Sequence, residues 1–395
     1  MNVGCFNIYK YFLYCFQKKL GAIYTSFTFQ PLASCRYGIE IVLRALVDNN
    51  NINQDSYVIL PSYTCQVVEN AVISAGCIPL YCDINSEDWS VSFDEYSRII
   101  QDSNHRNKSI IAFIMQHTYG ITPKDRDRII KLSNINSIHV IEDIAHCSHL
   151  KNYYSTFLKD STCIVGSFQA SKSVSSFQGG FIGINKNNHL LNMKLIHILK
   201  SEKQHFSLRL LISQLLDSTL NTFGFPFNSF RKMRVLISFL YKGMSSYEKN
   251  FDRHLYIMDF LRRGKANLIT LFFLNSALSK IKYINKRRAS MTVLYDKYFK
   301  INSLITEQIK KGNVLLLWPI SNKKINYKII EKVNKRYISN WFNPIIFPNS
   351  SVINLSISNQ FPKAESISKN DIRLHTLFSR KDFSDIKSVI DHHFK

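Results

Sequence analysis

The apolar positions of residues 37–185 alternate between two spacings along the chain. Helical spacing, with apolar residues three and four apart, occurs in YGIEIVLRAL, QVVENAVISAG and KDRDRIIKLSNI. Short apolar runs of strand length separate these segments, as in YVILP, CIPLYCDI, SIIAFIM, IHVIED and CIVGS. Short strands that alternate with helices are typical of βαβ units. The pattern therefore predicts an α/β fold with a mostly parallel sheet.

The pattern changes after residue 190. From Leu190 to about Asn267 the chain is helical, basic and apolar, as in LLNMKLIHILKSEKQ and FRKMRVLISFLYKG. Two interpretations stay open: helices that pack on the core with solvated lysines, or an interfacial segment on an anionic membrane. LSKIKYINKRRASMTVLYDKYF then predicts a long helix, followed by strands and a proline-bearing loop. We expect an N-terminal extension over 1–30, a large domain over 31–265 with the basic stretch at 190–265, and a small domain over 266–395.

Composition and charge narrow the function classes. The formal net charge of +23 fits either a compositional bias or an anionic partner. Nucleic acid is not expected, because no zinc-finger, RNP or helix-turn-helix signature accompanies the charge. The 8 cysteines are scattered without a CxxC pair, which is typical of reduced thiols and favours a cytoplasmic protein. The sequence predicts neither a membrane span nor a signal peptide.

Candidate chemistry lies where strands of the predicted sheet end. Asp143 closes the strand IHVIED, and Lys172 lies alone in a Ser/Gly-lined loop, five residues after Ser167. A buried carboxylate costs free energy unless it is paired, so Asp143 either caps the following turn or meets a cation. An aspartate, a lysine and a hydroxyl at this edge are the set that pyridoxal 5′-phosphate requires. The lysine forms the Schiff base, the aspartate holds the ring nitrogen protonated, and hydroxyl and N–H groups bind the phosphate.

Several ordered segments resemble the DegT/DnrJ/EryC1/StrS family of pyridoxal-phosphate sugar aminotransferases. VILPSYTCQVVENAVISAGCIPLYCDI, which contains Asp83, is similar to the family's strand, Pro turn, helix and strand. QHTYG resembles V-H-x-x-G, IEDIAHCSH resembles E-D-x-A-[QH], and GSFQASKS with its later Gly pair resembles S-F-x-x-x-K. FPKAESI and IRLHT resemble the C-terminal segments. The resemblance implies the aspartate aminotransferase-like fold (fold type I): a three-layer α/β/α large domain and a smaller C-terminal α+β domain.

The resemblance also implies roles for individual residues. Lys172 corresponds to the Schiff-base lysine, Asp143 to the partner of the pyridine nitrogen, and Ser167 to a phosphate ligand. His146 would lie against the ring or the substrate, or else be a satisfied core histidine. A metal at HCSH would need ligands from elsewhere, so we expect none.

Three departures mark the chain as a divergent member of the family. SCRYG replaces the usual Gly-Thr at the first helix, so Cys35 and Arg36 lie at the expected phosphate position, where Arg36 offers a charge in place of the backbone. Cys65 replaces the aromatic residue that commonly stacks on the ring, with Tyr63 as a candidate substitute. Asn267 is the nearest candidate for an asparagine that reaches the neighbouring subunit's phosphate.

The function that the resemblance implies is amino transfer from glutamate to a nucleotide-linked keto-sugar, for surface polysaccharide or O-antigen synthesis. A cytoplasmic homodimer is expected. One alternative is a pyridoxal-phosphate sugar dehydratase, which Lys172 disfavours because a histidine replaces the lysine in such members. The other is a non-catalytic or regulatory protein of the same fold, in peripheral contact with an anionic membrane.

Overall fold

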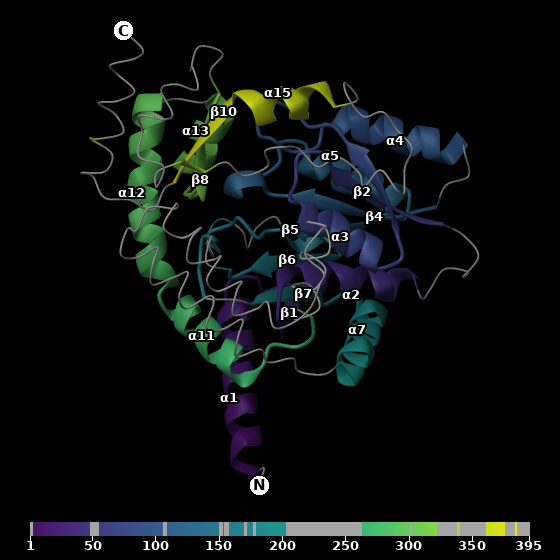
Figure 1. Ribbon diagram of the computed structural model, residues 1–395, viewed down its shortest axis with the longest axis vertical. Coiled ribbons are helices and arrows are strands. Elements are labelled where there is room, and N and C mark those ends of the chain that lie inside the picture. Colours follow the sequence, from purple (N-terminus) through teal and green to yellow (C-terminus); the bar gives the residue numbers. More distant parts are fainter. Residues whose placement is uncertain are drawn as a thin grey trace, which may run out of the picture.

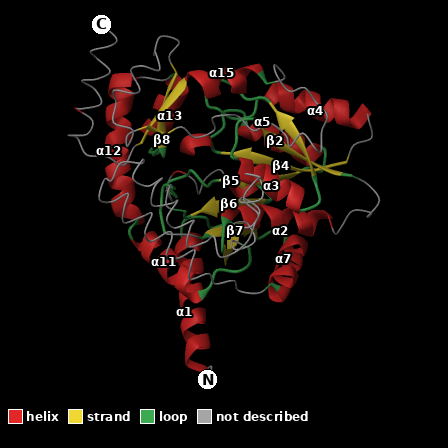
Figure 2. Ribbon diagram, in the orientation of Figure 1, coloured by secondary structure: helices red, strands yellow, loops and turns green. Residues whose placement is uncertain are grey.

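The protein combines a large α/β part with a smaller part built on a second sheet (Figures 1 and 2). This computed structural model describes residues 3–47, 55–105, 109–149, 153, 158–169, 172–176, 179–202, 263–299, 302–321, 338–339, 361–375 and 384. Most of the basic stretch expected at 190–265 therefore lies outside the described residues.

A seven-stranded sheet forms the centre of the large part, in the order β1-β7-β6-β5-β4-β2-β3. Its strands are β1 (Phe27–Leu32), β2 (Ser56–Pro61), β3 (Ile78–Cys82), β4 (Ser109–Gln116), β5 (His139–Asp143), β6 (Cys163–Ser167) and β7 (Gly180–Asn185). Strands β2 to β6 are parallel, whereas β7 runs antiparallel to both β6 and β1. The predicted mostly parallel sheet is confirmed.

Helices cover both faces of this sheet (Figure 1). In chain order they are α1 (Val3–Gly21), α2 (Cys35–Val47), α3 (Gln66–Ser74), α4 (Phe93–His105), α5 (Arg126–Ile135), α7 (His189–Ser201) and α11 (Leu268–Ser279), with short 3₁₀ turns at Thr118–Gly120 and Leu158–Asp160. One face carries α2, α3 and α7, and the other carries α4 and α5 beside α1 and α11. The large part therefore has the three expected layers.

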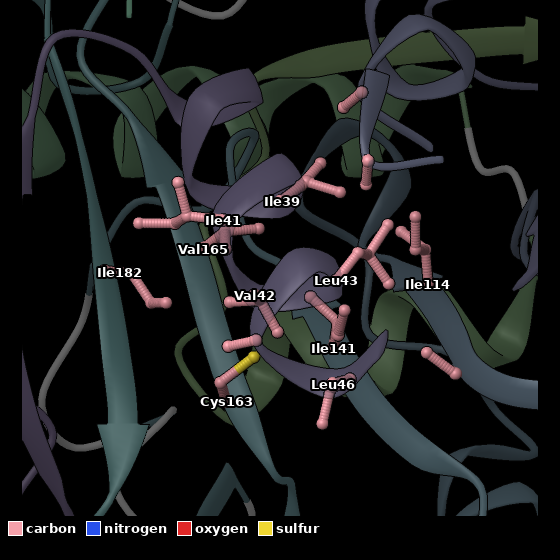
Figure 3. Close-up of a cluster of buried hydrophobic side chains, with 14 of the residues drawn as sticks. Ile39, Ile41, Val42, Leu43, Leu46, Ile114, Ile141, Cys163, Val165 and Ile182 are labelled. Carbon is pink, nitrogen blue, oxygen red and sulfur yellow. The ribbon is translucent and has the colours of Figure 1, made fainter. Parts of the chain in front are cut away.

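Helix α2 packs directly on the centre of the sheet (Figure 3). Its side chains Val42 and Leu46 meet Ile141 of β5 and Cys163 of β6 in one buried cluster. The helix is amphipathic: its charged residues, Arg36, Glu40 and Arg44, are four apart on one side, and apolar residues fill the rest of its surface. Its first turn is fixed by Ser34, whose Oγ accepts a hydrogen bond from the N–H of Tyr37 at 3.2 Å. The cap and the burial together set where this helix begins.

The smaller part consists of a three-stranded sheet and the helices around it. The strands β8 (Leu317–Ser321), β9 (Ile338–Ser339) and β10 (Asp371–His375) lie in the order β8-β10-β9, and the helices are α12 (Ile281–Phe299), α13 (Ser303–Lys310) and α15 (Pro362–Asn370). Its buried cluster joins Tyr295 and Trp318 to Tyr63 and Tyr119 of the large part. The two parts thus share a core.

Asp83 fixes the start of α15 from the other part of the molecule. Its carboxylate accepts hydrogen bonds from the N–H groups of Lys363 and Ala364, at 3.2 and 3.1 Å. The first N–H groups of a helix have no partner inside the helix, and a carboxylate there also favours the helix dipole. Asp83, which follows β3, therefore contacts the FPKAESI segment directly, although the two are far apart in the sequence.

Three elements were not expected from the sequence. Helix α1 buries Phe16 and Leu20, but it also exposes aromatic residues, which obscures its helical period. Strand β1 lies at the edge of the large sheet, so residues 27–30 of the expected extension take part in it. The expected long helix is α12, and it is preceded by α11, whose apolar sequence shows almost no helical periodicity.

Gly180→Ala should lower the free energy of unfolding by about 1–3 kcal/mol, as overpacking does. The added Cβ would lie 2.3 Å from the backbone N of Cys35, a contact that only a backbone shift can relieve. Gly21→Ala is the control, because a Cβ there meets nothing within 4 Å. Urea denaturation compares the two variants, and wild-type stability in Gly180→Ala would contradict the close approach of β7 to α2.

Candidate active site

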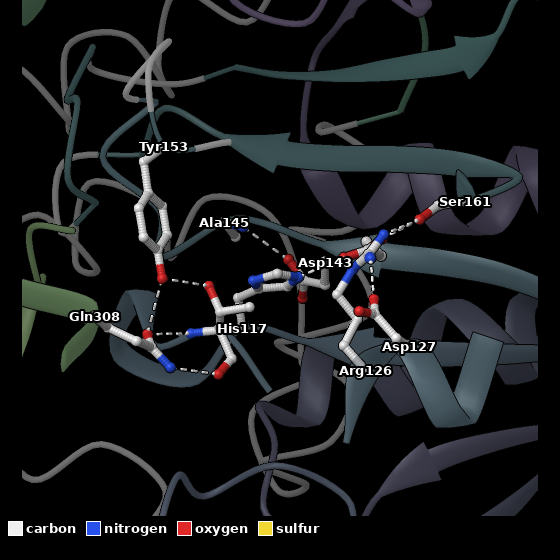
Figure 4. A network of polar contacts seen from close by, with 10 residues as sticks. His117, Arg126, Asp127, Asp143, Ala145, Tyr153, Ser161 and Gln308 are labelled. Atoms are coloured by element: carbon white, nitrogen blue, oxygen red, sulfur yellow. Dashed lines mark hydrogen bonds and ion pairs between the residues drawn. The ribbon is translucent and has the colours of Figure 1, made fainter. Parts of the chain in front are cut away.

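A buried network around Glu142 forms the base of the site (Figure 4). The Glu142 carboxylate receives hydrogen bonds from Arg126 Nη2 at 2.7 Å and contacts His117 Nε2 at 2.6 Å. Ser161 donates to the same carboxylate, and Arg126 also contacts Asp127 at 2.9 Å. All the groups except Asp127 are buried. The network ties β5 to the loop after β4 and to the start of α5.

The charge on Glu142 is held by its partners. Burial alone would raise the pKa of this carboxyl, but Arg126 and His117 lower it from 4.5 to about 2. Glu142 therefore stays ionised, and its negative charge compensates the buried Arg126. The neighbouring residue, Asp143, is directed to the opposite face of the strand.

Asp143 lies buried at the carboxyl end of β5. Its Oδ1 accepts a hydrogen bond from the N–H of Ala145 at 2.9 Å, and its carbonyl accepts one from the N–H of His117 at 3.0 Å. Burial raises the pKa of Asp143, and the Ala145 N–H and the positive charge of Lys172 oppose that rise. The side chain thus caps the following turn and also lies in the electrostatic field of Lys172. Asp143 therefore has both features that the sequence left open: it caps the following turn, and a cation acts on its carboxylate.

His146 is held in one orientation beside Asp143. The N–H of Tyr119 donates to His146 Nδ1 at 3.1 Å, and the two rings stack in parallel with centroids 6.3 Å apart. Burial, together with the charge of Lys172, holds the pKa of His146 well below its usual range. The ring is therefore neutral, and because Nδ1 accepts, the remaining proton resides on Nε2. His146 can act as a hydrogen-bond donor at that atom.

Tyr119 takes an uncommon backbone conformation to make this contact. Its φ is +59°, in the left-handed region that bulky residues rarely adopt. Its hydroxyl contacts the hydroxyl of Tyr63 at 2.6 Å, and its ring packs against Trp89. The N–H of Leu316, just before β8, donates to the Tyr119 carbonyl at 2.8 Å. Both parts of the molecule therefore stabilise this strained residue.

The loop between β6 and β7 brings Lys172 to the same edge. Ser173 Oγ donates to the carbonyl of His146 at 2.7 Å, and the Lys172 N–H donates to the carbonyl of Gln169 at 2.9 Å. Lys172 is half-buried. Its charge acts on the pKa of Asp143, of His146 and of the Cys35 thiol. The structure thus brings together four residues that the sequence singled out.

The start of α2 lies across the site from Asp143. Burial, reinforced by the charge of Asp143, raises the pKa of the Cys35 thiol well above its usual range, so the thiol is neutral. Gly180 packs against the backbone of Ser34 and Cys35, and it pairs in register with Ser167 on β6. Ser167 is therefore separated from the N-terminus of α2 by one glycine, with half-buried Arg36 in the first turn. The N-terminus of a helix and a hydroxyl therefore lie near each other at this point, which is the chemistry of an anion site.

The remaining sequence candidates have other surroundings. Cys65 is the residue before α3, and it lies in the electrostatic range of the Cys35 thiol. Tyr63 is fully buried, so no face of its ring is open to stack on a cofactor, and we withdraw it as a substitute for the missing aromatic. Asn267 caps α11 through a hydrogen bond from the N–H of Thr270 at 2.9 Å.

The sequence interpretation missed the supporting residues. Glu142 and His117 belong to the quoted segments IEDIAHCSH and QHTYG, but no role was assigned to either. Arg126 and Ser161 fall in segments without a motif. A glutamate next to Asp143 in a buried strand was the available signal, because a buried carboxylate requires a cation.

The fold is that of the fold-type I class of pyridoxal-phosphate transferases: a mostly parallel sheet with an aspartate at the end of β5 and a lysine between β6 and β7. The sequence model of the DegT/DnrJ/EryC1/StrS aminotransferase family matches residues 16–209. Over these residues the chain is similar to this family.

Curated relatives match only part of the chain. An uncharacterised protein of Methanocaldococcus jannaschii is 27% identical over 169 residues, which is 42% of this chain and 40% of that protein. GDP-perosamine synthase of Escherichia coli O157:H7 is 30% identical over 34% of this chain and 35% of its own length. Protein MosB of Rhizobium meliloti is 32% identical over 33% of this chain and 24% of its own length. The chain thus matches well under half the length of these relatives.

Solved structures agree with the fold over nearly the whole chain. PseC of Helicobacter pylori, an aminotransferase involved in pseudoaminic acid biosynthesis, gives a TM-score of 0.68 at 16% identity, covering 97% of this chain and 91% of PseC. NtdA of Bacillus subtilis, solved with bound cofactor PMP, gives a TM-score of 0.65 at 17% identity, covering 96% of this chain and 76% of NtdA. The expected family, fold and cofactor class agree with these findings.

Glu142→Gln should destabilise the fold by about 3–5 kcal/mol, because Arg126 then loses its buried counter-charge. Folding lowers the pKa of Glu142 from 4.5 to about 2. Its contribution to stability is therefore complete above about pH 4.5 and is lost as the pH falls toward 2. Urea midpoints measured between pH 7 and pH 3 should thus fall more steeply in the wild type than in Glu142→Gln.

The control for this comparison is Glu87→Gln, since Glu87 is an exposed residue paired with Lys124. This variant should follow the wild-type pH profile. A Glu142→Gln profile parallel to the wild type would contradict the assignment of the low pKa to Glu142.

Proposed function

We propose that the protein is a pyridoxal-phosphate-dependent aminotransferase whose site is the edge formed by Asp143, Lys172 and the start of α2. The observation that carries the proposal is the convergence of a buried aspartate, a neutral histidine and a single lysine where β5 and β6 end. Asp143 and His146 lie at the end of β5 and Lys172 follows β6, and the hydrogen bond from Ser173 to the His146 carbonyl holds the two loops together.

The residues fit the proposed cofactor. Burial leaves the pKa of Asp143 raised in the protein alone, so a protonated ring nitrogen would supply the positive charge that the carboxylate needs. The N-terminus of α2, Ser167 and Arg36 would hold the phosphate. Lys172 would hold the cofactor covalently through Nζ. Bound pyridoxal phosphate supplies an electron sink that stabilises negative charge at the carbon of an amino acid.

The protein residues would have distinct duties around that electron sink. Asp143 keeps the ring nitrogen protonated, because an ionised carboxylate in a buried site favours a neighbouring cation. Lys172 would move a proton through Nζ between the carbon of the amino acid and the carbon of the cofactor. His146 donates from Nε2 and orients the ring or the substrate, with Tyr119 fixing its tautomer.

The substrates we propose are glutamate as amino donor and a nucleotide-linked keto-sugar as acceptor, for surface polysaccharide or O-antigen assembly. Support comes from the relatives named for GDP-perosamine synthesis and for pseudoaminic acid biosynthesis. We also propose a cytoplasmic homodimer. A panel of nucleotide-linked keto-sugars, assayed for glutamate-dependent amine formation, tests the substrate class.

Borohydride reduction of the cofactor-loaded protein should attach the pyridoxyl group to Lys172, as read by peptide mass mapping. Lys172→Ala should lose the label and the amino transfer. Lys186→Ala should keep both, because Lys186 lies at the far end of β7, where Nζ contacts the carbonyl of Thr25 at 2.7 Å. A label on any other lysine would refute the assignment.

Asp143→Asn should lower the rate of amino transfer by roughly two orders of magnitude or more, as loss of a preorganised electrostatic partner does. The neutral amide cannot keep the ring nitrogen protonated, although it can still accept the hydrogen bond from Ala145. Single-turnover absorbance changes after glutamate addition measure the step, and the urea midpoint serves as the folding control. Near-normal turnover would show that the carboxylate only caps the turn.

A further inference from the structure

We propose that the aromatic ridge formed by Tyr11, Phe12, Tyr14 and Phe272 docks the protein on an anionic phospholipid surface. This surface lies on α1 and α11, away from the basic stretch at 190–265 that the sequence suggested for such a contact. The proposal is independent of the proposed function.

The ridge is continuous across two helices. The rings of Tyr11 and Phe12 are 5.7 Å apart, and Phe12 meets Phe272 of α11 edge-on at 5.8 Å. Tyr14 lies one turn after Tyr11 on the same side of α1. Tyr11, Tyr14 and Phe272 remain 63%, 60% and 52% exposed. Large apolar side chains that gather in this way mark an interaction surface.

The two helices are fixed to each other, so the ridge is a preformed surface. Asn275 Nδ2 of α11 donates to the carbonyl of Phe12 at 2.9 Å. Lys19 Nζ donates to the carbonyl of Asn275 at 2.9 Å and to Ser279 Oγ at 2.8 Å. Helix α1 projects beyond the large sheet, so its amino-terminal turns stand clear of the body (Figure 1).

The charged residues of α1 are all positive. Helix α1 carries Lys10, Lys18 and Lys19 and no acidic residue, and Lys18 Nζ lies 5.8 Å from the centre of the Tyr14 ring. Helix α11 has no charged residue, and Lys280 follows its last turn. Aromatic residues favour the headgroup region of a bilayer, and each lysine near an anionic surface adds attraction.

This charge pattern favours lipid over a second copy of the chain. A two-fold contact would bring the ridge against itself, and the lysines of both copies would then meet without an acidic partner on α1 or α11. Among the described residues no helix is long and apolar enough to cross a membrane. An amphipathic face with lysines at its border is suited to lie in the interface.

Sedimentation of the full-length protein with vesicles tests the proposal. We expect binding to vesicles of phosphatidylcholine with phosphatidylglycerol, little binding to phosphatidylcholine alone, and weaker binding as salt increases. Tyr14→Ser combined with Lys18→Gln should reduce binding to the anionic vesicles by about tenfold. Adding Tyr11→Ser and Phe272→Ser should abolish it.

A matched control is available on α5, where Lys131 and the exposed Ile135 have the same four-residue spacing. Lys131→Gln combined with Ile135→Ser should bind vesicles like the wild type. The proposal is overturned if the wild type ignores anionic vesicles at low salt, or if the ridge and control variants bind alike. It is also overturned if the ridge variant changes the oligomeric state in analytical ultracentrifugation, since the ridge is then a contact between copies.

Discussion

The ion pair between Glu142 and Arg126 is the interaction on which the rest of the site depends. It lies under the carboxyl edge of the sheet, where two charges without each other would cost several kcal/mol. Because His117 shares the same carboxylate, the pair also fixes the loop after β4, and the backbone of that loop then contacts Asp143. The position of the candidate cofactor partner therefore follows from a charge pair that faces away from it.

The site itself is assembled from loops that hold one another through backbone groups. The hydroxyl of Ser173 donates a hydrogen bond to the carbonyl of His146, and the N–H of Leu316 donates one to the carbonyl of Tyr119. The hydroxyl of Ser148 donates one to the carbonyl of Val314. Because backbone carbonyls accept the hydrogen bonds between the loops, the side chains with proposed chemical roles are not needed for these contacts. Such an arrangement leaves room for exchange of the residues that contact a ligand, as at Cys35 and Arg36, where we propose that the phosphate binds.

The sequence predicted an element correctly where the spacing of its apolar residues followed one period, that of a strand or that of a helix. The β2 to β6 strands and the α2, α3 and α5 helices are short, strongly patterned segments, and their order implied the parallel sheet. Helix α11 was not predicted because it is apolar on all sides, including the exposed Ile269 and Phe272, so no polar face reveals its period. The lysine and aspartate were visible because each is unusual in its surroundings. The role of Arg126 could not be predicted, because its partner Glu142 lies on another element and only the fold brings the two side chains together.

Capping of α15 by Asp83 has a consequence for the order in which the chain acquires its structure. The contact spans 280 residues between Asp83 and Lys363, among the most distant in sequence that the described residues make. Closing so long a loop is entropically unfavourable until much of the intervening chain is compact. During synthesis the sheet around β3 can form well before FPKAESI leaves the ribosome. The FPKAESI segment thus folds against a sheet that has already formed, and α15 begins where the Asp83 carboxylate can accept hydrogen bonds from its first N–H groups.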